Sequence, residues 1–173
     1  MSSIRIGDID IHYELADYTD PWASSDTVLL HHGFARNMEF WRPWVPLLAR
    51  DYRVLRFDSR GCGKTSVPAP DEPYTLERMV DDALGLMDAL GIERVHWAAE
   101  ASGGHVGLAL ALRRPERVQS LTLCNTPFRL PTARRRKRPS RSCANRRKSP
   151  LRRRRLPSRR NLIFPKRRLP ARC

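Results

Sequence analysis

Short apolar runs alternate with longer amphipathic segments through most of the first 125 residues, and this alternation limits the folds that the chain can adopt. The apolar runs span a few residues each and lie between turn residues, which is typical of strands. The predicted strands are residues 27–32, 52–58, 94–99 and 117–125. Single helices between successive strands indicate βαβ units with right-handed crossovers, so we expect an α/β fold with a mostly parallel sheet.

A hairpin and two helices complete this prediction. Residues 3–15 alternate apolar and polar side chains on both sides of Gly7, which predicts an antiparallel hairpin at the N-terminus. Thr75 precedes a long amphipathic segment that ends at Gly91, and these residue types favour the N-terminal and C-terminal caps of a helix. A second helix is predicted over residues 102–114, where the next proline stops it.

Residues 38–50 are also predicted to be helical, although Pro43 and Pro46 disturb the first turns. With the period of an α-helix, four apolar side chains would share one face of this segment. These side chains are Phe40, Trp44, Leu47 and Leu48.

The net charge of +15 is concentrated at the C-terminus. Residues 1–130 hold 14 Lys and Arg against 18 Asp and Glu, whereas residues 131–173 hold 19 basic residues and no acidic one. The second segment also has six prolines and few apolar residues, so self-repulsion and the lack of a core predict disorder. We therefore expect a domain over residues 1–130 and a disordered basic tail over residues 131–173.

Two origins of the tail are considered. A selected basic arm would bind nucleic acid or another polyanion through its charge. A shifted reading frame is favoured, because GC-rich coding DNA read out of frame gives much Arg, Pro, Ala and Ser. The domain would then be truncated, with the strand at residues 117–125 on an uncovered edge of the sheet. Such edges pair with other chains, so self-association is expected.

Neither membrane nor metal binding is expected. The chain has no run of about 18 apolar residues, and its N-terminus lacks the apolar run of a signal peptide, which favours a cytoplasmic location. The four cysteines form no C-x-x-C motif, and no cofactor is expected. Adjacent strand residues face opposite ways, so His31 and His32 should not share a metal ion. The Gly-Lys-Thr at residues 63–65 is not a phosphate-binding loop, because the first glycine of that motif would fall on Asp58.

Four short motifs occur in an order and spacing that point to one family. They are "LLHHGF", "FDSRGCGKTS", "LGIERVHWAAEASGG" and "LALALRRPERVQSLTLCNTP". Their characteristic residues are His32, Gly33, Asp58, Arg60, Gly61, Gly63, Gly103 and Gly104. From residue 4 to about residue 128 the chain resembles the α/β-hydrolase family, and within it the enol-lactone and small carboxylic-ester hydrolases.

The resemblance implies the N-terminal half of an α/β-hydrolase sheet with a nucleophile elbow, the sharp strand-to-helix turn that holds the catalytic serine. In such a site two backbone N–H groups form the oxyanion hole, and here they would belong to Phe34 and Ser102. The family's acid and histidine lie on later loops. The last histidine of this chain is His105 and the last acid is Glu116, both on or just after the elbow helix.

The register of the elbow decides which residue takes the nucleophile position. The turn is so tight that the residues two before and two after the nucleophile must be small. For Ala101 these neighbours are Ala99 and Gly103, whereas for Ser102 the first of them would be Glu100. We therefore place the nucleophile position at Ala101, where it is vacant, and keep Ser102 as the alternative nucleophile.

The resemblance thus implies a relative of carboxylic-ester and lactone hydrolases, with a small ester or lactone as the family's substrate. The chain itself is expected to be inactive, because the nucleophile, the acid and the histidine of the catalytic triad are missing. Two alternatives are a nucleic-acid-binding protein that acts through the basic tail, and a non-catalytic small-ligand binder.

Overall fold

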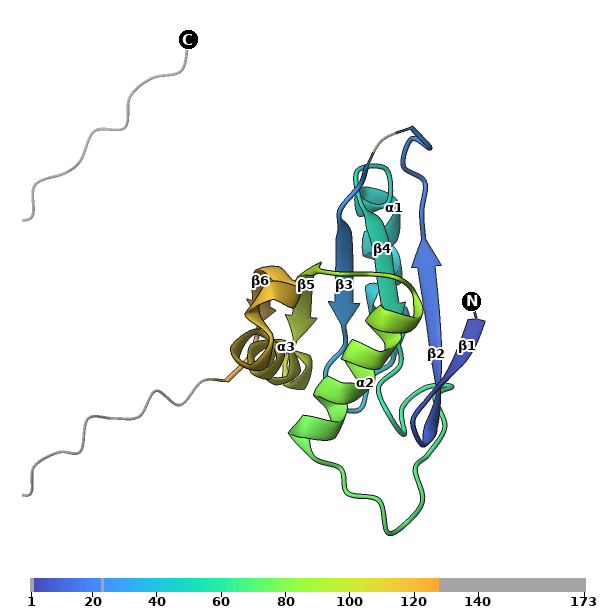
Figure 1. The fold of residues 1–173 in the computed structure, drawn as a ribbon, viewed down its shortest axis with the longest axis vertical. Coiled ribbons are helices and arrows are strands. Elements are labelled where there is room, and N and C mark those ends of the chain that lie inside the picture. Colours follow the sequence, from blue (N-terminus) through green and yellow to red (C-terminus); the bar gives the residue numbers. More distant parts are fainter. Residues whose placement is uncertain (1, 23, 128–173) are drawn as a thin grey trace, which may run out of the picture. The chain divides into compact units, whose positions relative to one another are not determined.

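The computed structural model describes residues 2–22 and 24–127, which form one six-stranded sheet with helices on it (Figure 1). The strands lie in the order β1-β2-β4-β3-β5-β6. Their bounds are β1 Ser2–Ile6, β2 Ile9–Ala16, β3 Thr27–His31, β4 Arg53–Phe57, β5 Val95–Glu100 and β6 Val118–Cys124. β1, β2 and β4 pair antiparallel, whereas β4, β3, β5 and β6 pair parallel, so the predicted α/β sheet with an N-terminal hairpin is confirmed.

The helices divide between the two faces of the sheet, as Figure 1 shows. Helices α2 (Leu76–Ala89) and α3 (Ser102–Arg113) pack on one face, and the short helix α1 (Val45–Leu48) lies on the other. All five residues of β3 are buried, and their side chains alternate between the two cores. Leu29 belongs to the core under α2 and α3, whereas Val28 and Leu30 belong to the core under α1. Burial on both faces explains why β3 is an uninterrupted apolar run.

The predicted caps of α2 are confirmed. The Thr75 hydroxyl accepts a hydrogen bond of 3.2 Å from the Arg78 backbone N–H, which satisfies one of the free donors at the helix N-terminus. At the other end, Gly91 has a φ of 65°, the left-handed conformation that commonly ends a helix. The helix α3 ends at Arg113, two residues before Pro115, as predicted.

The predicted apolar face of residues 38–50 is wrong. The segment forms a 3-10 helix over Met38–Trp44, followed by the single turn of α1. Met38 and Trp41, one 3-10 turn apart, are its buried residues, and Val45 is the buried residue of α1. By contrast, the predicted face is largely exposed: Phe40 by 36%, Trp44 by 52% and Leu47 by 70%, with only Leu48 half-buried against the core.

Strand β6 is one edge of the sheet, and none of its residues is fully buried. Its pairing with β5 is irregular at one point. Val95 pairs with Val118, but the next residue, His96, pairs with Ser120, so Gln119 is an extra residue that forms a β-bulge. Among the described residues β6 has a neighbouring strand on one side only, while an uncovered edge and self-association through it stay predictions.

In the part of the chain that the structure describes, no helix has the length and apolar character needed to cross a membrane. The predictions for residues 131–173 lie outside the described residues.

Candidate active site

The turn between β5 and α3 has the geometry of a strained elbow. Ala101 lies between the strand and the helix with a φ of 48° and a ψ of −116°. A positive φ at a residue other than glycine costs about 1–3 kcal/mol and persists only where the surrounding contacts enforce it. Here the Ala101 N–H donates to the Cys124 carbonyl at 3.0 Å, and the Ala101 carbonyl accepts from the Gly104 N–H at 3.1 Å. The turn residue of the elbow is therefore Ala101, and Ser102 is the first residue of the helix.

The glycines around the elbow are required by close packing. A Cβ atom on Gly103 would lie 2.7 Å from the His32 carbonyl oxygen and 2.9 Å from that of His31, both of which are backbone atoms. A side chain on Gly104 would overlap Thr126. The end of β3, the start of α3 and the segment after β6 thus meet without room for another methyl group.

The two predicted oxyanion donors follow the ends of neighbouring parallel strands. Phe34 comes after Gly33 in a turn where Ala35 has a φ of 58°, and its side chain is 86% exposed. Ser102 is the first helical residue of α3, so its N–H has no acceptor within the helix and lies at the positive end of the helix dipole. In the sheet, His31 at the end of β3 pairs with Ala99 near the end of β5. The two donors therefore follow neighbouring strands that are paired at their ends. Their role as an oxyanion hole stays a prediction.

His31 and His32 are buried, and their ring nitrogens are used internally. The Ser59 N–H donates to His32 Nε2 at 3.0 Å, so the proton of that ring is on Nδ1, which donates to the Gly33 carbonyl at 2.8 Å. His31 Nδ1 donates to the His32 carbonyl at 2.9 Å, and its Nε2 lies 3.3 Å from the Ser59 hydroxyl. Burial lowers the pKa of His31 to about 3 and also lowers the pKa of His32, so both rings are neutral.

The expectation that these two rings face opposite ways is wrong. Their centroids lie 5.6 Å apart in a stacked arrangement, because β3 ends at His31 and His32 already belongs to the turn. In the described residues no group of three His, Cys, Asp or Glu side chains is arranged to hold a metal ion.

All five histidines of the sequence lie within the described residues. His105 on α3 has its Nε2 3.1 Å from the Pro127 carbonyl, and His12 packs beside Ser3 in the hairpin. His96 lies near the start of β5, at the opposite end of that strand from the elbow. Among residues 2–22 and 24–127, none of these rings has a hydrogen bond to Ala101 or Ser102. The structure thus does not bring a histidine base to either candidate nucleophile.

Asp58, the first residue of the predicted Asp-x-Arg-Gly-x-Gly motif, has a structural function. Its side chain is buried, and its two oxygens accept the backbone N–H groups of Met38 at 2.7 Å and Lys64 at 2.8 Å. Gly61 and Gly63 allow the loop to turn around this carboxylate, with φ values of 68° and 53°. Asp58 therefore closes the loop, with both carboxylate oxygens engaged by backbone N–H groups.

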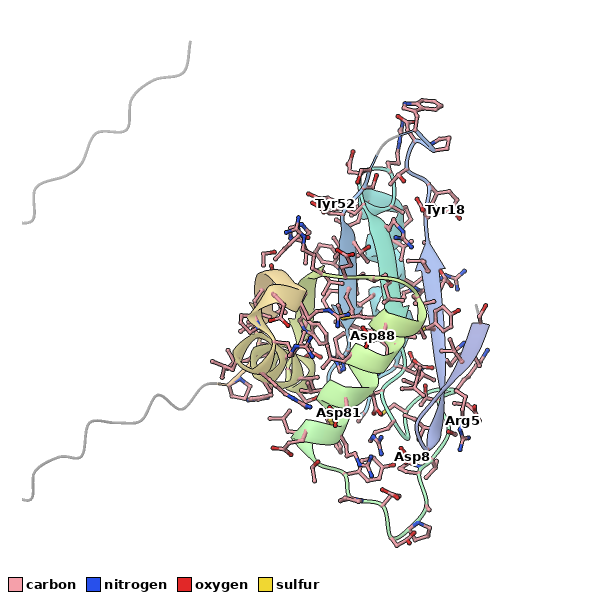
Figure 2. All side chains as sticks on the ribbon, in the orientation of Figure 1. Arg5, Asp8, Tyr18, Tyr52, Asp81 and Asp88 are labelled. Atoms are coloured by element: carbon pink, nitrogen blue, oxygen red, sulfur yellow. The ribbon has the colours of Figure 1, made fainter. Side chains whose placement is uncertain are left out.

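Arg60 joins three parts of the fold, and we call its contacts with Asp8 and Asp82 the arginine clasp. Its fully buried guanidinium donates two hydrogen bonds to Asp82 on α2, of 2.7 and 2.8 Å, and two longer ones to Asp8 in the hairpin turn. Figure 2 labels Asp8 at this turn. Burial raises the pKa of Asp82, and the hydrogen bonds and charge of Arg60 oppose that rise. For Asp8, burial would raise the pKa, but the hydrogen bonds and the charges of Arg60 and Arg78 together lower it.

Glu100, which precedes Ala101, makes a contact at the elbow that its place in the sequence does not predict. Its Oε2 atom is buried and has no hydrogen-bond partner among the described residues, although Arg36 Nε approaches it at 3.5 Å. Arg36 also lies over the ring of Phe40, 4.3 Å from its centroid, beside a hollow of about 550 Å³ that Asn37 and Cys62 help to line. The Glu100 carboxylate at the end of β5 therefore faces the Arg36 guanidinium in the loop after β3. This contact depends on the pairing of β3 with β5, which the sequence does not reveal.

Comparison with known proteins identifies the family of this fold. The α/β-hydrolase fold family matches residues 26–143. A protein of Caulobacter vibrioides with the provisional name carbamate hydrolase RutD is 38% identical over 126 residues, which cover 72% of this chain and 46% of that protein. A protein of Stutzerimonas stutzeri with the same provisional name is 41% identical over 115 residues, covering 66% of this chain and 42% of that protein.

Two solved structures show the same likeness. A hydrolase from Pseudomonas aeruginosa is similar with a TM-score of 0.66 and 38% identity, over 75% of this chain and 47% of that one. The enol-lactonase from Burkholderia xenovorans is similar with a TM-score of 0.61 and 32% identity, over 68% of this chain and 44% of that one. The chain spans less than half the length of these relatives.

Proposed function

Since this chain belongs to the α/β-hydrolase fold family, we propose that residues 2–127 carry the first part of an ester, lactone or carbamate hydrolase site that lacks its nucleophile. The observation that supports this most directly is the alanine at the strained turn of the elbow, with a φ of 48°. The methyl group of Ala101 has no lone pair with which to attack a carbonyl carbon. The likeness to an enol-lactonase and to relatives named as carbamate hydrolases supports the substrate class.

The remaining groups of the site bind without performing a reaction. The Phe34 and Ser102 N–H groups would hold the carbonyl oxygen of a small ester, lactone or carbamate, as oxyanion-hole donors do. A serine needs a base to remove its proton, because the protonated hydroxyl is a weak nucleophile. The neutral, internally hydrogen-bonded His31 and His32 do not supply that base. We therefore propose that the chain is a non-catalytic binder of small carbonyl compounds.

The test measures turnover of p-nitrophenyl acetate beyond one equivalent, and fluorophosphonate labelling of residues 101 and 102 mapped by mass spectrometry. We expect neither from the full chain, and neither from its Ala101→Ser variant, which gains an oxygen but no base. Turnover by the unchanged chain that Ser102→Ala abolishes would refute the proposal and identify Ser102 as the nucleophile.

A repaired protein gives the positive arm of this test. Joining Ala101→Ser to a C-terminal half that carries an acid and a histidine should restore hydrolysis and label residue 101. If the repaired chain that keeps Ala101 is labelled at Ser102 instead, the proposed register is wrong by one residue.

The charge of residues 131–173 supports a second proposal, non-specific polyanion binding. Nineteen cations without an acidic residue should attract DNA of any sequence, and the affinity should fall steeply with salt as counterions are released. Filter binding with unrelated DNA duplexes over a salt series tests this, with deletion of residues 131–173 as the control. A marked preference for one sequence, or a weak salt dependence, would refute a purely electrostatic interaction.

A further inference from the structure

A second group of nucleophilic and basic side chains lies away from the elbow, near the start of β5. Ser120 Oγ on β6 lies 2.8 Å from His96 Nδ1 on β5. On the other side of the ring, His96 Nε2 lies 3.6 Å from Asp26 Oδ2, just before β3. A serine, a histidine and a carboxylate in this order are the arrangement that activates a serine for acyl transfer, and it is recognised by geometry and not by sequence position.

The β-bulge in β6 brings these residues together. Neighbouring side chains of a regular strand point to opposite faces, so only one of Gln119 and Ser120 could reach the His96 side of the sheet. Because Gln119 is the extra residue of the bulge, both can do so. The Gln119 side-chain amide donates to Asp26 Oδ1 at 3.3 Å, while Ser120 contacts His96. The irregular pairing thus places a nucleophile and a group that orients the carboxylate next to each other.

Other contacts restrict how the histidine and the carboxylate move. Tyr52, labelled in Figure 2, lies edge-on to the His96 ring with centroids 5.8 Å apart. The Asp26 backbone carbonyl accepts a hydrogen bond of 3.0 Å from the N–H of Arg53, the first residue of β4. This bond holds Asp26 beside the start of β4. The group is nevertheless accessible, since Ser120 is exposed and the side chains of His96 and Asp26 are 30% and 52% exposed.

We propose that Ser120 is a nucleophile of this chain, outside the elbow, with His96 as its general base and Asp26 as the residue that positions the ring. The neutral ring would carry its proton on Nε2, facing Asp26, which leaves Nδ1 free to accept from the Ser120 hydroxyl. When Ser120 Oγ attacks the carbonyl carbon of an ester, its proton passes to His96 Nδ1. The bond to the leaving alkoxide or phenolate then breaks, and the acyl group stays on Ser120.

The contacts limit the acyl donors that this site accepts. General-base catalysis raises a reaction rate by about 10²–10⁴-fold, and this is the one catalytic effect that the three side chains provide. We therefore expect reaction with activated compounds, such as aryl esters and fluorophosphonates, whose leaving groups need little stabilisation. We also expect a stable acyl-serine and not repeated turnover, so this single reaction is separate from the binding assigned to the elbow.

The experiment uses the full chain and a fluorophosphonate probe, with the labelled serine located by peptide mass spectrometry. We expect one equivalent of label on Ser120. His96→Gln keeps a polar side chain but removes the base, so labelling of Ser120 should become about 100-fold slower, the lower end of the range for general-base catalysis. His105→Gln is the matched control, because His105 contacts Pro127 and not Ser120, and it should leave the rate unchanged.

Asp26→Asn separates positioning from folding. It should slow labelling by a smaller factor and shift the His96 proton from Nε2 toward Nδ1, as read from the ring 15N chemical shifts. Absence of label on Ser120, or equal rates for the unchanged chain and a folded His96→Gln variant, would overturn the proposal. An unchanged His96 tautomer in Asp26→Asn would overturn the role of Asp26. Label on Ser102 would count against the proposed function of the elbow, whereas label on Ser120 leaves that function standing.

Discussion

Replacing Arg60 with methionine should destabilise the domain far more than the loss of a comparable ion pair on the surface. The Arg60 side chain is completely buried, and its partner Asp82 is only 9% exposed. Methionine fills a similar volume but leaves the Asp82 carboxylate buried without its two hydrogen bonds of 2.7 and 2.8 Å. Removing one partner of a buried pair costs about 3–5 kcal/mol, a large part of the roughly 5–15 kcal/mol that stabilises a domain.

The surface pair between Arg113 and Asp81 provides the matched control. Its distance of 2.6 Å is shorter than those of the arginine clasp, but its side chains are 53% and 49% exposed. Asp81 is labelled on α2 in Figure 2. An exposed pair contributes about 0–1 kcal/mol, so Arg113→Met should change little. The comparison thus tests whether burial, and not distance, determines the contribution of an ion pair in this domain.

Urea unfolding followed by circular dichroism measures the difference. With an m-value of about 2 kcal/mol per molar, a loss of about 4 kcal/mol lowers the midpoint by about 2 M. The double variant Arg60→Met/Asp82→Leu should recover most of this loss, because no unpaired charge stays buried. The loss in Arg60→Met should also be smaller in mildly acidic buffer. Burial raises the pKa of Asp82, so the folded variant binds a proton that the unfolded chain does not. Equal midpoint shifts for Arg60→Met and Arg113→Met would refute the reasoning.

Three further predictions concern the pH dependence and the packing of the domain. Burial lowers the pKa of His31 from 6.5 to about 3, so below pH 6.5 the unfolded chain binds a proton that the folded one does not. As the pH falls from 6.5 toward 3, the free energy of unfolding should decrease by about 1.4 kcal/mol per pH unit. His31→Asn should remove that slope from a pH series of urea midpoints. Gly103→Ala should lower the midpoint by an amount equivalent to about 1–3 kcal/mol or more, because its methyl group would meet two backbone carbonyls; an unchanged midpoint would contradict this. Trp41→Ala should cost about 3–5 kcal/mol and Trp44→Ala much less, since Trp41 is 5% exposed and Trp44 52%; similar thermal shifts for both would contradict this difference in burial.

The sheet could be predicted from the sequence because its strands carry the signal in their own residues. β3 is buried on both faces and is therefore an uninterrupted apolar run, and β5 follows the C-terminal cap at Gly91. The segment around Trp41 could not be predicted in the same way. Its apolar residues fit an α-helical period, but the segment begins with a 3-10 helix that contains Pro43 and buries Met38 and Trp41.

The candidate sites differ in the same respect. The position of the elbow turn depends on small residues within one short segment, and the positive φ of Ala101 falls where that pattern places the turn. By contrast, the contact between Ser120 and His96 depends on a bulge in the pairing of two strands that lie 24 residues apart. Nothing in either strand alone marks the bulge. The approach of Glu100 on β5 to Arg36 in the loop after β3 likewise depends on the pairing of two strands.

The arginine clasp has a consequence for the order in which a ribosome completes this domain. Arg60 follows Asp8 by 52 positions, and Asp82 comes 22 positions after Arg60. A hairpin such as β1–β2 forms within microseconds once both strands are available, but an isolated hairpin is only marginally stable in water. At about 5–20 residues per second, translation needs several seconds more to produce Asp82. During this interval Ile9 and Ile11, which are buried in the finished domain, have no helix to cover them. The β1–β2 hairpin is synthesised before α2 but is fixed in place only when α2 packs on it, and nascent-chain chaperones would find it exposed until then.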